Sequence, residues 1–112
     1  MTWLTGAMTG ATARNGDDEY SVRENRTTGR FELLRGDELI GFATYRDHQG
    51  VVALPHVETL WAHRGRGFAS RLMDGIVEIL RADGREMVPR CSFAAGYMRD
   101  HPEHRDLLQS DW

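Results

Sequence analysis

Two glycines stand between a β-rich segment and an amphipathic helix, and this junction constrains the fold more than any other stretch. It reads Arg64-Gly65-Arg66-Gly67-Phe68-Ala69, and the helix that follows is predicted to run to about Arg81. The first turn of a helix presents backbone N–H groups without intrahelical partners, together with the positive end of the helix dipole. Glycine there lets a ligand reach the backbone. The junction therefore predicts an anion site, for phosphate above all, although a plain turn before a helix gives the same glycine pair.

Length and composition predict a single small soluble domain. The chain has 112 residues, of which 40% are hydrophobic and 28% are charged, a usual balance for a globular protein with one modest core. No apolar run approaches the roughly 20 residues of a membrane helix, and we expect no secretory signal at the N-terminus. A single cysteine forms no internal disulfide, which favours a cytoplasmic location.

Charge excludes several classes of function. The net charge of −3 provides no overall basic footprint for nucleic acid. All 14 cationic side chains are arginines, so mechanisms that need a lysine nucleophile, Schiff base or phosphate-loop lysine are excluded. We expect no metal site, because Pro102 interrupts the spacing of His101 and His104 and no further ligand follows.

Short alternating segments separated by turn residues predict an antiparallel meander before the junction. Strands are expected over 20–25, 30–35 and 38–46, followed by an extended segment from Val51 to about Trp61. Pro55 lies inside that segment and has no N–H to donate, so a bulge or splayed position is expected there. Residues 1–18 show no sustained period and are expected to form a flexible tail, which leaves 19–112 as the domain.

Helical spacing returns after the junction. One apolar stripe is expected to comprise Phe68, Leu72, Ile76, Ile79 and Leu80. Asp83-Gly84 ends this helix, and a short strand over 87–91 and a second helix over 93–100 follow. The order predicts a mixed α/β domain whose strand–helix–strand unit forms a parallel pair. Ligands of such units bind at the carboxyl ends of the strands.

The junction resembles the acyl-CoA signature of the Gcn5-related N-acetyltransferases (GNAT), Arg/Gln-x-x-Gly-x-Gly/Ala, through Arg64, Gly67 and Ala69. Other stretches are similar to a small subfamily, the YjdJ-type acetyltransferase-like proteins: 36–40, His56, 88–93, Tyr97 and 101–103. The resemblance covers about Tyr20 to Leu108 and implies a compact GNAT-like fold with acetyl-CoA as the cofactor. Three positions depart from the subfamily, which usually has threonine, proline and tyrosine where this chain has Val57, Ser92 and His104.

In that family the loop amides hold the pyrophosphate of coenzyme A, and a backbone amide of the preceding strand end polarises the thioester carbonyl. The resemblance thus implies a cofactor-binding set made of Thr59, Leu60, Trp61, Arg64, Gly65, Arg66, Gly67, Phe68 and Ala69. The side chains of Arg64 and Arg66 are expected to add charge-assisted contacts to phosphate.

Four side chains are candidates for catalysis. His56 and Glu58 are two apart on a strand and so share a face. Histidine suits a general base near neutral pH, with a structural hydrogen-bonding role as the alternative, and Glu58 is the weaker candidate. Cys91 is either a thiol that relays the acetyl group or a small packing residue. Tyr97 lies where many relatives keep a tyrosine that protonates the departing thiolate, or is an ordinary core aromatic.

The sequence therefore predicts a small N-acetyltransferase that uses acetyl-CoA and a small-molecule or protein amine, with no nucleic-acid or membrane partner. One alternative is a coenzyme A or acyl-CoA binding module with little transferase activity. Another is an interaction domain that keeps only the fold. In so short a chain the acceptor groove is expected to be shallow or open, and neither the acceptor nor the oligomeric state follows from the sequence.

Overall fold

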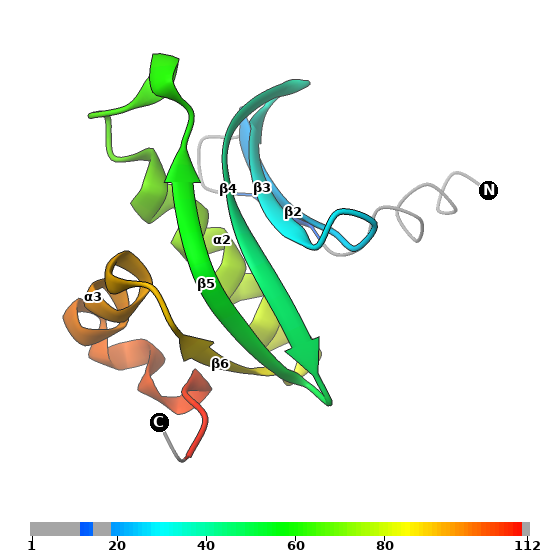
Figure 1. Cartoon of the computed structure of the whole chain (residues 1–112), viewed down its shortest axis with the longest axis vertical. Coiled ribbons are helices and arrows are strands. Elements are labelled where there is room, and N and C mark those ends of the chain that lie inside the picture. Colours follow the sequence, from blue (N-terminus) through cyan, green and yellow to red (C-terminus); the bar gives the residue numbers. More distant parts are fainter. Residues whose placement is uncertain (1–11, 15–18, 111–112) are drawn as a thin grey trace.

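A curved six-stranded sheet with one long helix across one face makes up the domain (Figure 1). The computed structural model describes residues 12–14 and 19–110. The strands are β1 (Thr12–Arg14), β2 (Tyr20–Asn25), β3 (Arg30–Arg35), β4 (Glu38–His48), β5 (Val51–Thr59) and β6 (Glu86–Pro89), and they lie side by side in chain order. The helices are α2 (Phe68–Asp83) and α3 (Ser92–Asp100), with 3₁₀ turns η1 (Trp61–His63) and η2 (Pro102–Leu107).

The predicted mixed α/β class is confirmed. Strands β1 to β5 pair antiparallel, whereas β5 and β6 are parallel and are connected through α2. Strands β2 and β3 have their predicted bounds, but β4 continues to His48 and β5 ends at Thr59, because Trp61 already belongs to η1.

The N-terminal boundary needs one revision. Thr12–Arg14 fall in the segment that the sequence assigned to a tail, yet they pair with β2 as the first strand of the sheet. A three-residue strand shows too little alternation to be recognised from sequence alone. The rest of the predicted tail, residues 1–11 and 15–18, lies outside the described residues.

The core lies between α2 and one face of the sheet. The predicted helical stripe is confirmed: its last four members are buried, and Phe68 packs partly buried against them. Val52 and Leu54 of β5 reach this core from the sheet. Full burial of one such aliphatic side chain stabilises the fold by about 1.5–3 kcal/mol, so the α2 face accounts for much of the stability.

Gly75 lets α2 pack tightly against the sheet. A Cβ built on this glycine would overlap the side chain of Val22 on β2. We predict that Gly75→Ala destabilises the protein by about 1–3 kcal/mol through overpacking, although alanine is the better helix former. Urea unfolding checks this against Gly96→Ala on α3, where the added Cβ meets only the movable end of Arg99. Equal stability of the two variants would contradict the close packing.

Strand β5 pairs with β6 over only the first half of its length. Residues Val51 to Leu54 pair with β6, and the N–H groups of Arg90 and Cys91 then both donate to the carbonyl of Leu54, at 3.0 and 3.1 Å. Beyond that point the chain after β6 turns away from β5 and enters α3 (Figure 1). The register between β4 and β5 also shifts around Pro55, which confirms the predicted irregularity. The second half of β5 therefore has an open edge.

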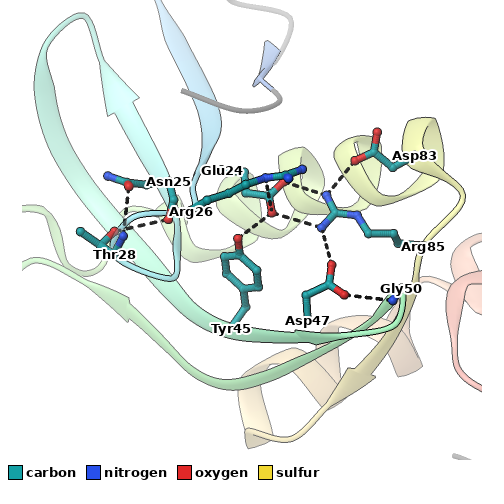
Figure 2. A network of polar contacts seen from close by, with 9 residues as sticks. All are labelled: Glu24, Asn25, Arg26, Thr28, Tyr45, Asp47, Gly50, Asp83 and Arg85. Atoms are coloured by element: carbon teal, nitrogen blue, oxygen red, sulfur yellow. Dashed lines mark hydrogen bonds and ion pairs between the residues drawn. The ribbon is translucent and has the colours of Figure 1, made fainter. Parts of the chain in front are cut away.

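A buried ionic network fastens the far end of α2 to the sheet (Figure 2). Arg85 donates to both carboxylate oxygens of Glu24, at 2.7 and 3.1 Å, and also to Asp47 at 2.9 Å and Asp83 at 2.8 Å. The Tyr45 hydroxyl donates to Glu24 at 2.6 Å. Glu24 is 1% exposed and Arg85 is 9% exposed, so the two charges depend on each other for compensation.

Candidate functional site

The glycine loop leaves the first turn of α2 without a cap. Gly65 and Gly67 have φ values of 81° and 76°, in the left-handed region that favours glycine. Gly67 is the N-cap residue, and because it has no side chain it cannot accept a hydrogen bond from the first N–H groups of the helix. A Cβ on either glycine would meet nothing within 4 Å. The first N–H groups of α2 therefore adjoin open space, which fits the predicted phosphate site.

Arg64 and Trp61 shape the chain between β5 and this loop. The Nε atom of Arg64 donates to the carbonyl of Thr59 at 3.1 Å. Its guanidinium also lies 5.6 Å from the ring centroid of Trp61, a ring that is 80% exposed. Both Arg64 and Arg66 are exposed. The Arg64 side chain already has these contacts within the protein. Contacts of either arginine with phosphate stay a prediction.

His63 ties the same segment to the rest of the sheet. Its Nε2 atom lies 3.0 Å from a carboxylate oxygen of Glu38, at the start of β4. Its ring also packs edge-on against Phe68 at the start of α2, with 6.1 Å between centroids. These contacts position the glycine loop from both sides. His63 was not predicted as a site residue, because its partner Glu38 lies 25 residues away in the sequence.

Two backbone N–H groups point to the open edge of β5. The Leu60 N–H donates to the carbonyl of Ile40 on β4 at 2.9 Å. Glu58 and His56 lie two and four residues before Leu60 and also pair with β4, so their N–H groups point to the same side as that of Leu60. Because hydrogen-bonding groups alternate sides along an antiparallel strand, the N–H groups of Val57 and Thr59 point away from β4. The amide of Leu60 is engaged with β4, so Thr59 and the unanticipated Val57 supply the open N–H groups.

A groove of about 350 Å³ runs along this edge and brings together six of the predicted residues. Its lining consists of His56, Val57, Glu58, Thr59, Arg64, Gly65, Ala69 and Phe93. The Nε2 atom of His56 lies 2.9 Å from Glu58 Oε1, which confirms that the two share a face. Phe93, at the start of α3, was not predicted as a site residue. The predicted residues outside this lining are Leu60, Trp61, Arg66, Gly67, Phe68, Cys91 and Tyr97.

Tyr97 lies in a neighbouring hollow of about 200 Å³ that shares Phe93 with the groove. Its hydroxyl donates to Asp74 Oδ1 at 2.5 Å, and its ring stacks on His101 with 4.0 Å between centroids. Burial, and then the hydrogen bond to Asp74, raise the pKa of Tyr97 above its usual range. The hydroxyl therefore keeps its proton at neutral pH, and its role as an acid stays a prediction.

Cys91 caps α3. Its Sγ atom accepts from the Ala94 N–H at 3.4 Å, and its own N–H donates to Leu54. The side chain is half-buried against the core and lines neither hollow beside α3. These contacts describe a structural residue, and the relay of an acetyl group through Cys91 stays a prediction.

A family model described as GCN5-related N-acetyl-transferase matches residues 30–107. The chain belongs to the GCN5-related N-acetyltransferase family. The resemblance read from the junction is thereby confirmed at the level of the GNAT family, and with it the assignment to the acyltransferases. The family model does not distinguish subfamilies, so membership of the YjdJ-type subfamily stays a prediction.

One solved structure supports the GNAT fold, and a second is reported for comparison. The NMR structure of a GCN5-like protein from Staphylococcus aureus is 19% identical and covers 72% of this chain and 81% of its own, with a TM-score of 0.53. A crystal structure of a GNAT-family protein from Desulfovibrio desulfuricans is 16% identical and covers 67% of this chain and 52% of its own, with a TM-score of 0.47. The curated proteins contain no match to this chain. Within residues 12–14 and 19–110, neither α2 nor α3 has the length and apolarity that a membrane-crossing helix requires.

Proposed function

We propose that this GNAT protein transfers an acetyl group from acetyl-CoA to an amine, in a reducing cytoplasmic setting. One observation carries the proposal. The uncapped N-terminus of α2 and the candidate base His56 meet at one groove, since Gly65, Ala69 and His56 all line it. An uncapped helix start beside a titratable side chain suits acetyl transfer from acetyl-CoA, because it offers donors for phosphate and a general base for the amine.

The residues present fit the cofactor. Acetyl-CoA supplies an acetyl group activated as a thioester. Backbone N–H groups between Gly65 and Ala69 would hold its pyrophosphate with the help of the α2 dipole. The N–H groups of Val57 and Thr59 would polarise the acetyl carbonyl, and their direction toward the open edge of β5 supports this role.

In this proposal His56 is the general base for the acceptor amine, and Glu58 orients it. When an amine nitrogen bonds to the acetyl carbon and the thiolate leaves, His56 would accept the proton that the amine loses. Glu58 orients the imidazole through the contact of 2.9 Å. The leaving thiolate would take its proton from solvent or from Tyr97, whose hydroxyl donates to Asp74 in this structure.

A second candidate function is a coenzyme A binding module with little transfer activity. The exposure of His56 favours it, because the side chain is 54% exposed and water competes for its contacts. Both functions use the same phosphate site and differ only in whether an amine is acetylated.

Calorimetry and a thiol-release assay separate these functions. We expect acetyl-CoA, coenzyme A and desulfo-CoA to bind with similar affinity, and thiol release to require an added amine. His56→Gln should lower kcat by about 10²–10⁴-fold, as expected for loss of a general base, with the Kd for acetyl-CoA unchanged. Binding without release across a panel of small and peptide amines would establish the binding module. Failure of all three ligands to bind would overturn both functions.

Cys91 distinguishes direct transfer from a relay through sulfur. We predict that Cys91→Ser retains turnover, because serine keeps the cap on the Ala94 N–H and direct transfer needs no thiol. Cys91→Ala should lose about 1 kcal/mol of stability with the lost cap and still turn over. Thiol release by both variants at the wild-type rate checks this, and loss of turnover in Cys91→Ser with an unchanged melting temperature would show the relay instead.

A further inference from the structure

A second groove lies on the same sheet, away from the glycine loop. It has a volume of about 340 Å³, and its lining includes Arg46 and His48 of β4, Val51 and Ala53 of β5, and Val88 and Arg90 at the end of β6. Its size lies within the range of small-molecule sites. Nothing in the acetyl transfer described above uses these residues.

The register places this groove on the sheet face opposite α2. Arg46 pairs with Ala53, which in turn pairs with Val88, so these three form one row across the sheet. Their neighbours Val52 and Leu54 alternate to the other face and pack in the core. The groove is therefore built on the face that α2 leaves uncovered.

Two arginines supply positive charge in this groove. Arg46 and Arg90 line it together with the imidazole of His48, and its lining contains no carboxylate. Asp47 turns to the opposite face, where it accepts from Arg85, and Glu86 lies on the groove's face beside Val51 but outside the lining. In a chain with a net charge of −3, such a cluster is a local feature. The guanidinium group of an arginine binds a carboxylate or a phosphate through two parallel hydrogen bonds.

The groove and the candidate base share one strand and one face. His56 pairs with Thr44 and Ala53 pairs with Arg46, and Thr44 and Arg46 lie on the same side of β4. Thr44 and Arg46 are two residues apart, about 7 Å at a rise of about 3.3 Å per residue, and the irregularity at Pro55 lets the three-residue step from Ala53 to His56 span about 7–10 Å on the same face. A single small molecule is long enough to reach from the groove to the imidazole.

We infer that this groove binds the anionic group of the acceptor. The acceptor is then an amine that carries a carboxylate or phosphate about 7–10 Å from its nitrogen, held by Arg46 and Arg90 while His56 faces the amine. This inference rests on the proposed acetyl transfer and names the chemical class of its second substrate.

NMR titration tests the anion site without any enzymatic activity. Inorganic phosphate and glutarate serve as separate probes, so the two anion types are distinguished. We expect saturable shifts of the Val51, Ala53 and Val88 amides, and at least 10-fold weaker binding in the double variant Arg46→Gln/Arg90→Gln. The matched control Arg99→Gln/Arg105→Gln removes the same charge from exposed positions and should bind like the wild type. Shifts confined to 65–69, or equal losses in both double variants, would overturn the site.

The acceptor role is tested by comparing amines of equal length with and without an anionic group. We expect a lower KM for the anionic amines, and a loss of that preference by at least 10-fold in Arg46→Gln/Arg90→Gln but not in the control. Thiol release from neutral and anionic amines with equal KM would overturn the inference and leave the proposed function standing. Phosphate binding in the groove without any binding of acetyl-CoA would overturn both the proposed function and the acceptor role.

Discussion

Gly67→Glu is expected to weaken the binding of acetyl-CoA by at least about 100-fold while the protein stays folded. A glutamate at this N-cap places its carboxylate beside the first N–H groups of α2, where it satisfies the donors and repels phosphate. The space is available, because a Cβ there meets nothing within 4 Å. Strain is modest, since a φ of 76° costs a non-glycine residue about 1–2 kcal/mol. Calorimetric titration measures the affinity, and circular dichroism reports the fold.

Gly84→Glu is the matched control at the other end of the same helix. Gly84 has a φ of 68° and an equally open Cβ position, so this variant carries the same strain and the same added charge. It should bind acetyl-CoA like the wild type. If both glutamates weaken binding equally, or if neither does, the first turn of α2 is not the phosphate site.

The second large effect is expected in stability. Arg85→Met should lower the free energy of unfolding by about 3–5 kcal/mol, because it leaves the carboxylate of Glu24 buried without its partner. Arg26→Met is the control: Arg26 lies 3.5 Å from the same carboxylate, but its side chain is 67% exposed, so the expected loss stays below about 1 kcal/mol. Urea unfolding at pH 7 measures both. Equal losses would show that burial does not decide the strength of this network.

The pH dependence of the same network has a definite sign. Burial alone disfavours the charged form of Glu24, but hydrogen bonds from Arg85 and Tyr45 outweigh it and lower the pKa of Glu24 below its ordinary value of 4.5. A carboxyl with a depressed pKa stabilises the fold above that ordinary value, and the contribution is lost as pH falls through the folded pKa. The gap in stability between wild type and Arg85→Met should therefore narrow below about pH 4.5. A gap that is constant from pH 7 to about pH 3 would contradict this coupling.

Local patterns were enough to predict the elements that carry the site. The spacing of Leu72, Ile76 and Leu80 predicted α2 and its buried face, and the turn residues of the first half predicted the meander. The glycine pair predicted an uncapped helix start, because side-chain caps come from residues that glycine replaces. His56 and Glu58 were predicted to share a face from the two-residue repeat of a strand alone.

Features that depend on residues far apart in the sequence could not be predicted from it. Arg85 meets Glu24 across 61 residues, and Tyr97 meets Asp74 across 23, so neither pair shows a local pattern. The open N–H group of Val57 depends on where β6 stops pairing with β5, which is set by Pro89 and the start of α3. The groove around Arg46 combines three strands, and only their register reveals it.

An amide-resolved NMR titration with acetyl-CoA shows whether the first N–H groups of α2 bind its pyrophosphate, as proposed. We expect large, saturable shifts of the Gly65, Gly67, Phe68 and Ala69 amides, with smaller shifts at Val57 and Thr59. Saturable binding that leaves the four loop amides unmoved, or no binding at all, would contradict this proposal.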